Sequence, residues 1–279
     1  MSESFHSGGL RIAFELRGEG PSLLMICGFR RSRVIWGDAF LAPLAKRFRL
    51  VLFDNRGTGD SDKPATGYSI AAFADDASAL LRHLGIPRAH VFGVSMGGMI
   101  AQTLASRHSS QLWGLALGCT HAGGTSVVPP ENEIWQLLRL LPSAELNATE
   151  VAHRQEAAYY TDAFRICGRK VIDAIQAQVQ RKPAPPHAVQ GHLAAIKAFD
   201  GHERLSDLRM PTLVLTGEAD RLIMPENSRR IAQRISHARL AVIPDAAHFF
   251  WIEKPAESAA LLGEYFSSLE DPSTSKGAT

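Results

Sequence analysis

A serine between two glycines is the residue of this chain best suited to chemistry. Ser95 lies at the centre of Gly93-Val94-Ser95-Met96-Gly97, a Gly-x-Ser-x-Gly pattern. An apolar run over 89–92 precedes it, and a run with helical character follows over 99–105. A strand, a tight turn and a helix around one serine are typical of a nucleophile elbow, which exposes the hydroxyl above a sheet edge. The pattern alone also suits an ordinary glycine-rich turn, so the interpretation depends on partner residues.

A serine hydroxyl needs a base beside it, and the base needs a group that orients it. Asp220 follows an apolar run that ends at Gly217, and His248 follows the next apolar run. The chain order Ser, Asp, His is the one expected for this type of elbow. Glu218 is a rival acid, and His248 is one of 11 histidines. We predict Ser95, Asp220 and His248 as a catalytic triad because all three come directly after predicted strands.

Attack by a hydroxyl on a carbonyl creates an oxyanion, which preorganised N–H donors stabilise. We expect one donor to be the backbone N–H of Met96, at the start of the helix after the nucleophile. The second is the backbone N–H of Phe29, after the apolar run 22–27, where Gly28 permits the turn that aims it. The alternative is that this pair of residues merely ends a strand.

Apolar runs and helical periodicity indicate how these residues are positioned. Alternation predicts a half-buried strand over 10–16, and continuous apolar runs predict buried strands over 22–27, 50–53, 89–93, 112–117, 211–217 and 239–243. Helical spacing predicts helices over 36–48, 70–84, 99–105, 226–235 and 255–269. Strands alternating with helices indicate an α/β fold, with a parallel sheet and helices on both faces. In such sheets the carboxyl ends of the strands share one ligand-binding edge.

Strand runs are missing between about residues 123 and 205, where helices are expected over 131–141, 149–161, 170–180 and 188–199. We interpret this segment as a helical cap inserted into a core built from residues 1–122 and 206–269. The tail, residues 270–279, is rich in Ser, Thr, Pro, Gly and Lys and is expected to be disordered.

Composition narrows the classes of partner. Hydrophobic residues make up 45% of the 279 residues and charged residues 21%, and the formal net charge is +2. This balance predicts no nucleic-acid or membrane partner. The N-terminus has no signal-peptide pattern, and three cysteines without paired spacing indicate neither a disulfide framework nor a metal site, so we expect a cytoplasmic protein. A homo-oligomer is compatible with the sequence, and no cofactor is expected.

The chain resembles the α/β-hydrolase superfamily over nearly its whole length. The matching pieces are Gly28-Phe29, 54–59, 93–98, 217–220 and Ala247-His248. It is similar to the branch that holds 3-oxoadipate enol-lactonases, small esterases and cofactor-free haloperoxidases. The resemblance implies an α/β-hydrolase fold with a mostly parallel sheet and a helical cap. Two departures are Cys27, where the family usually has histidine, and the basic loop Arg30-Arg31-Ser32-Arg33.

The basic loop and several aromatic residues bear on the substrate. Arg30, with Arg31 and Arg33, either holds a carboxylate or pairs locally with acids. An apolar substrate pocket between cap and sheet is expected to draw on Trp36, Trp135, Tyr159, Tyr160, Phe249 and Trp251, although plain core or cap packing is the alternative. Cys27 and Cys119 are expected to be buried packing residues.

The sequence thus predicts a serine hydrolase that cleaves a small-molecule carboxylic ester or lactone through an acyl-enzyme intermediate. The same triad serves carbon–carbon bond hydrolysis and perhydrolysis of the haloperoxidase type. A third alternative is a ligand receptor on a hydrolase scaffold, or a tailoring protein of a biosynthetic pathway. These alternatives remain open at this level.

Overall fold

An eight-stranded sheet forms the centre of the molecule. The structure is a computed structural model that describes residues 3–140, 143 and 145–269. The strands follow the order β1-β2-β4-β3-β5-β6-β7-β8 across the sheet. Their bounds are β1 Glu3–Ser7, β2 Leu10–Arg17, β3 Ser22–Ile26, β4 Arg49–Phe53, β5 Ala89–Val94, β6 Leu112–Gly118, β7 Thr212–Gly217 and β8 Arg239–Ile243. β1 and β2 are antiparallel to their neighbours, and all other pairs are parallel. The predicted mostly parallel sheet is confirmed.

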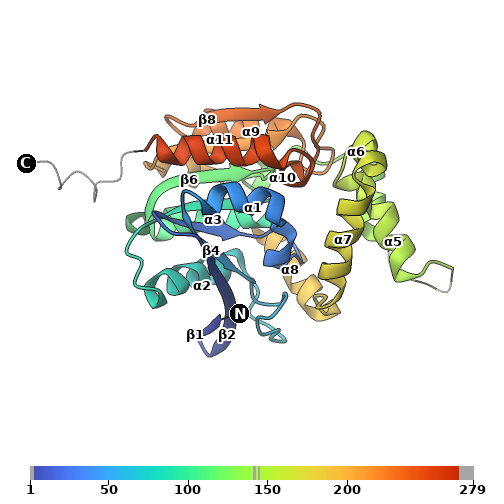
Figure 1. Cartoon of the computed structure of the whole chain (residues 1–279), viewed down its shortest axis with the longest axis horizontal. Coiled ribbons are helices and arrows are strands. Elements are labelled where there is room, and N and C mark those ends of the chain that lie inside the picture. The colour runs from blue at the N-terminus through green and yellow to red at the C-terminus, as the bar shows by residue number, and fades with distance from the viewer. Residues whose placement is uncertain (1–2, 141–142, 144, 270–279) are drawn as a thin grey trace, which may run out of the picture.

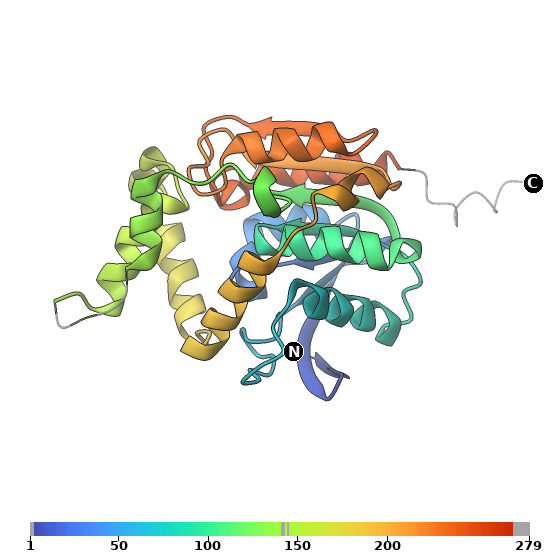
Figure 2. The same cartoon turned by 180° about the vertical axis from the view of Figure 1, so that it is seen from behind.

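Helices cover both faces of the sheet, as Figures 1 and 2 show. One face packs against α2 (Ile70–His83), α3 (Met96–Arg107) and α9 (Pro225–Arg234). The other packs against α1 (Asp38–Ala45), α10 (Phe250–Glu253) and α11 (Pro255–Ser267). Strands β5 and β7 are buried along their whole length, which explains why apolar residues predominate in both.

The segment between β6 and β7 is helical and stands beside the main body (Figure 1). Its α-helices are α4 Asn132–Arg139, α5 Ala148–Gln155, α6 Asp162–Cys167, α7 Arg169–Gln180 and α8 Pro186–Ala198. The two ends of the segment meet, because Gly123 forms an isolated antiparallel bridge with Asp200 and the Gly201 N–H donates to the Ala122 carbonyl at 2.7 Å. We propose that this segment is the cap predicted for residues 123–205.

Three local predictions need correction. β1 was not predicted, since its five residues have too short a pattern to stand out. The predicted helix over 149–161 is interrupted: α5 ends at Gln155, a short 3-10 turn follows, and the Thr161 side chain caps the new helix α6. The predicted helix over 36–48 begins only at Asp38, because Gly37 separates a 3-10 turn from α1. The predicted tail, residues 270–279, lies outside the described residues.

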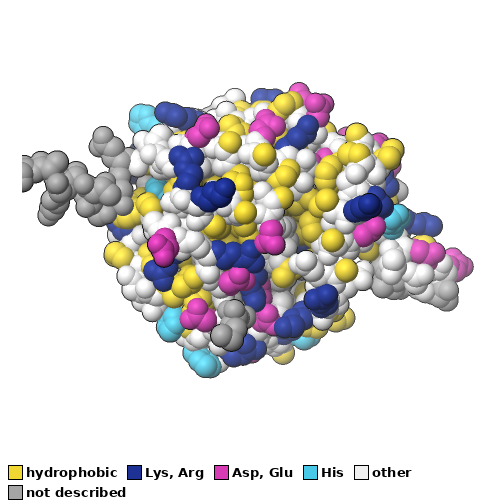
Figure 3. Space-filling model, in the orientation of Figure 1, with side chains coloured by type: hydrophobic (Ala, Val, Ile, Leu, Met, Phe, Trp, Pro, Cys, Tyr) yellow, Lys and Arg dark blue, Asp and Glu magenta, His cyan; other side chains and the backbone are white. Residues whose placement is uncertain are grey.

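The visible surface carries charges of both signs. In Figure 3, Lys and Arg side chains alternate with Asp and Glu over the face shown, and apolar side chains lie between them. None of the helices in the described part of the chain has the length and apolar character needed to cross a bilayer.

Glycines make the elbow between β5 and α3 sterically feasible. A Cβ on Gly97 would collide with the carbonyl oxygen of Ile26 and lie 2.7 Å from that of Cys27. A Cβ on Gly93 would lie 2.6 Å from the carbonyl carbon of Gly97 and 2.9 Å from Ala101 Cβ. The strand and the helix therefore approach each other, and β3, at a distance that only glycine allows.

Gly97→Ala should destabilise the protein by about 3 kcal/mol, because the obstacle is backbone that cannot move aside cheaply. Urea unfolding followed by circular dichroism measures the change. Gly263→Ala in α11 is the matched control, since its Cβ would meet only the flexible ends of Arg47 at 3.3 Å and Leu44 at 3.6 Å. The control should keep or slightly raise stability, because alanine is a better helix former. Equal effects of the two substitutions would contradict this account of the elbow.

Candidate active site

Ser95 is held in a strained backbone conformation at the tip of β5. Its φ is 56° and its ψ is −123°, outside the regions that side-chain-bearing residues ordinarily occupy. Its N–H donates to the Gly118 carbonyl at 2.9 Å, and its own carbonyl accepts from the Thr120 hydroxyl at 2.7 Å. The residue is half-buried. Contacts to β6 and the turn after it thus fix the geometry predicted for a nucleophile.

Asp220 and His248 form a buried hydrogen-bonded pair, although 28 residues separate them. His248 Nδ1 lies 2.9 Å from Asp220 Oδ2, and the two side chains are 2% and 0% exposed. The other carboxylate oxygen of Asp220 accepts from the N–H groups of Leu222 and Ile223, each at 2.9 Å. The carboxylate therefore orients the imidazole and is itself oriented by backbone. The rival acid Glu218 is exposed.

The loop that carries His248 is anchored on both sides of the histidine. The Ala247 N–H donates to a carboxylate oxygen of Glu253 in α10 at 2.9 Å. The Phe249 N–H donates to the carbonyl of Tyr159 at 3.0 Å, and the Thr161 hydroxyl donates to Glu253 at 2.6 Å. Two of these contacts come from the segment between β6 and β7. That segment therefore helps to set the position of the histidine.

Cys119 is the immediate neighbour of the Asp–His pair, which the sequence did not reveal. It is buried, as predicted, and its Sγ, an Asp220 oxygen and a His248 nitrogen lie within 4.8 Å of one another. Burial raises the pKa of the Cys119 thiol, and His248 offsets this only in part. Burial alone would lower the pKa of His248, but Cys119 and Asp220 outweigh it and raise that pKa well above its usual value.

The spacing of these three residues would also suit a metal ion, since thiolate, imidazole and carboxylate are common zinc ligands. Both oxygens of Asp220 already accept hydrogen bonds, however, from the His248 ring and from two backbone N–H groups. Binding a cation there would disrupt the contacts that orient the histidine. We therefore interpret the group as an Asp–His pair with an adjacent thiol.

Two backbone N–H groups border Ser95 without an acceptor among the described residues. Met96 is the first residue of α3, so its N–H has no partner within the helix. The Phe29 N–H likewise appears in no hydrogen bond of the described chain. A Cβ built on Gly28 would lie 3.6 Å from Ser95 Oγ, which places the 28–29 turn against the serine. Both N–H groups therefore lie near Ser95 and donate to no acceptor within the described residues, and their role as oxyanion donors stays a prediction.

The Ser95 hydroxyl forms no hydrogen bond with His248 within the described part of the chain. Cys119 links the two residues instead, because its thiol lies beside the His248 ring and near the Ser95 N–H. Catalytic hydrogen bonds are often long or poorly aligned until a substrate is bound. The structure therefore pairs Asp220 with His248, whereas the contact between His248 and the Ser95 hydroxyl stays a prediction.

The residues predicted for the pocket divide into two groups. Tyr159 and Phe249 stack face to face, with ring centres 4.7 Å apart, and lie 6.2 and 5.6 Å from the His248 ring. Trp36, in contrast, is fully buried between Phe40, Phe92 and Trp251, and Trp135 is 45% exposed on α4. We therefore place Trp36 in the core rather than in the pocket. The apolar sequence around Trp36 did not distinguish these two locations.

His192 of α8 is a second residue that the sequence did not reveal. It is fully buried; its Nε2 lies 2.9 Å from the Arg56 carbonyl, and its Nδ1 accepts from the Arg30 N–H at 3.4 Å. Burial lowers the pKa of His192, which keeps the ring neutral and lets it donate at one nitrogen and accept at the other. His192 thus connects the cap segment to the residue that follows Phe29.

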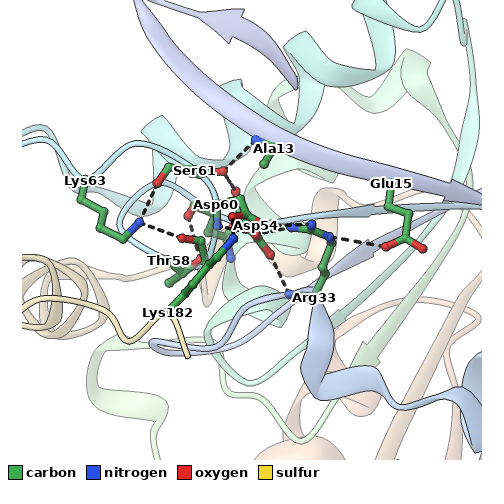
Figure 4. A network of polar contacts seen from close by, with 11 residues as sticks. Ala13, Glu15, Arg33, Asp54, Thr58, Asp60, Ser61, Lys63 and Lys182 are labelled. Atoms are coloured by element: carbon green, nitrogen blue, oxygen red, sulfur yellow. Dashed lines mark hydrogen bonds and ion pairs between the residues drawn. The ribbon is translucent and has the colours of Figure 1, made fainter. Parts of the chain in front are cut away.

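The three arginines of the basic loop have different environments. Arg33 is enclosed by acids: it forms ion pairs with Asp54, with Asp60 at 3.1 Å and with Glu15 at 3.6 Å, and Asp60 also pairs with Lys182 of the cap segment (Figure 4). Arg33 is therefore a structural residue. Arg30 donates to the Gln155 amide oxygen at 2.8 Å, and Arg31 lies against the rings of Tyr159 and Phe249.

Comparison with known proteins identifies the family. Residues 21–255 match the family model described as the alpha/beta hydrolase fold. The chain belongs to the α/β-hydrolase family. The predicted resemblance is thereby confirmed.

Two sequence relatives and one solved structure are similar to this α/β-hydrolase over most of its length. The chain is 31% identical over 246 residues to a protein of Caulobacter sp. (strain K31) named as a carbamate hydrolase, RutD, with 86% of this chain and 89% of that protein covered. It is 24% identical to 3-oxoadipate enol-lactonase 2 of Acinetobacter baylyi, with 86% of each covered. A thermophilic esterase from Thermogutta terrifontis, solved with malate bound, superposes with a TM-score of 0.81 at 26% identity, covering 97% of this chain and all of that one.

The environment of His248 predicts its titration. Because the raised pKa keeps the ring charged to higher pH, the NMR signals of a 15N-histidine-labelled sample should place its midpoint above about 6.5. Asp220→Asn should move that midpoint down, because the carboxylate charge that stabilises the protonated ring is removed. His121, whose pKa burial lowers to about 4, is the internal reference and should not move. A His248 midpoint that Asp220→Asn leaves unchanged would contradict the described pairing.

Proposed function

We propose that this α/β-hydrolase is a serine enzyme that cleaves a small-molecule carboxylic ester or lactone through an acyl-enzyme intermediate on Ser95. The observation that carries the proposal is the buried Asp220–His248 pair at the sheet edge where the strained Ser95 also lies. Next to Ser95 are two N–H groups without an acceptor among the described residues. The esterase and enol-lactonase among the similar proteins support the reaction class. The carbamate hydrolase supports attack on an acyl carbonyl of a related kind.

The geometry suggests a role for each group. Asp220 holds Nδ1 of His248, so Nε2 is the nitrogen that takes the Ser95 proton as Oγ attacks the carbonyl carbon. The Phe29 and Met96 N–H groups stabilise the oxyanion of the tetrahedral intermediate. His248 then returns the proton to the leaving alcohol, which leaves the acyl group on Ser95.

Hydrolysis of the acyl-enzyme repeats these steps with water as the nucleophile. His248 removes a proton from the water as it attacks the ester carbonyl, and Ser95 Oγ takes the proton as it leaves. In a lactone the leaving alcohol remains attached to the acyl chain, so the product is a single hydroxy acid. No metal ion or organic cofactor has a role in this scheme.

Ser95→Ala and His248→Ala should each lower kcat by about 10^4-fold or more while the protein remains folded, because either change removes the nucleophile or its base. Initial rates on a panel of chromogenic esters, lactones and carbamates measure this, with circular dichroism as the folding check. Glu218→Ala is the control and should keep its activity, since Glu218 lies two residues before Asp220, the proposed acid of the triad, but is exposed. Full activity of Ser95→Ala on every panel member turned over by the native protein would refute the proposal.

A further inference from the structure

Arg31 is a positive charge beside the site without an acidic partner. Neither Arg31 nor Arg30 forms an ion pair with any carboxylate among residues 3–140, 143 and 145–269, whereas Arg33 two residues later pairs with three acids. Arg31 is half-buried. A cation that loses hydration without gaining a counter-ion is unfavourable, so such a side chain is suited to an anion that arrives from outside.

Aromatic rings hold the Arg31 guanidinium close to the histidine. Its central carbon lies 5.2 Å from the ring centre of Tyr159 and 5.5 Å from that of Phe249. The same two rings neighbour the His248 ring, so the guanidinium and the imidazole share one pair of aromatic neighbours. The Tyr159 side chain also hydrogen-bonds to Arg31, so the guanidinium is held by neutral groups, and its charge is available to attract a carboxylate.

Arg30 adds a second positive charge to the same region. It follows Phe29 with φ 50°, and its guanidinium binds Gln155 and lies 5.7 Å from the Phe29 ring centre. Burial alone would raise the pKa of Tyr159, but the charges of Arg30, Arg31 and His248 outweigh it and lower that pKa. Arg30, Arg31 and His248 thus all lie close enough to Tyr159 to act on its phenol group, and Tyr159 itself is buried.

We propose that the substrate carries a carboxylate and that Arg31 binds it while the ester or lactone carbonyl lies at Ser95. Arg30 strengthens the positive potential from the Gln155 side. The substrate class is therefore a monoester, or an acidic lactone, derived from a dicarboxylic acid. This inference deepens the proposed function and rests on it, since it names the part of the substrate that does not react.

A pair of matched substrates tests the inference. The 4-nitrophenyl monoester of adipic acid carries a free carboxylate, and 4-nitrophenyl methyl adipate has the same chain with that carboxylate masked. The native enzyme should favour the charged ester by about tenfold or more in kcat/KM, as expected for a charge-assisted contact. The preference should shrink at high salt, because ionic strength screens the attraction.

Substitutions of Arg31 test whether this residue causes the preference for the charged ester. Arg31→Met keeps the unbranched stem and removes the charge, so the ratio of kcat/KM between the charged and the neutral ester should fall to about unity. Arg31→Lys should retain part of the preference. Arg229→Met is the matched control, because Arg229 is an exposed arginine of α9 that pairs only at 3.7 Å with Glu226. The control should match the native enzyme on both esters.

The outcomes separate this inference from the proposed function. Turnover of both esters with no preference for the charged one, or a preference that survives Arg31→Met, overturns the carboxylate subsite and leaves the serine hydrolase intact. If neither ester is turned over, calorimetric titration of Ser95→Ala with adipate decides the subsite alone. Binding that weakens about tenfold in Ser95→Ala with Arg31→Met supports it, and binding unaffected by the second substitution, or absent, refutes it.

Discussion

The structure of the site depends on the close approach of three backbone segments beneath Ser95. β5, the first turn of α3 and the end of β3 meet where Gly93 and Gly97 leave no room for a Cβ. This contact forces Ser95 to a positive φ and brings the Gly28-Phe29 turn against its side chain. The backbone conformation of Ser95 and the position of the Phe29 N–H are thus consequences of one steric constraint, and neither requires a flexible side chain to be positioned independently.

The other half of the site is built by contacts between distant parts of the chain. Asp220 and His248 follow neighbouring parallel strands, so their side chains meet at one sheet edge. Three residues of the segment between β6 and β7 form hydrogen bonds with the loops at this edge: Tyr159, Thr161 and His192. Because these contacts hold the loops of His248 and of Phe29, movement of that segment would change the position of His248 relative to the Phe29 N–H.

Much of the fold could be predicted because the sequence patterns that indicate it extend over only a few consecutive residues. Buried parallel strands have continuous apolar sequences, and the elbow has a glycine pattern whose steric reason is visible in the residue types alone. Asp220 and His248 could be predicted because they follow two such strands directly. The roles of Cys119 and His192 could not, since a buried cysteine and a cap histidine have the same sequence appearance whether they touch the site or only fill space. Trp36 and Tyr159 illustrate the same limit, because only the tertiary structure places one in the core and the other beside His248.

The central claim is that Ser95, and not the neighbouring Cys119 thiol, attacks the carbonyl. A carbamoylating ester such as 4-nitrophenyl dimethylcarbamate leaves a slowly hydrolysed group on the attacking atom, and peptide mapping by mass spectrometry locates that group. We expect one carbamoyl group per chain, on Ser95, formed much more slowly in His248→Ala. A carbamoyl group on Cys119, or a folded protein that remains unmodified, would contradict the claim.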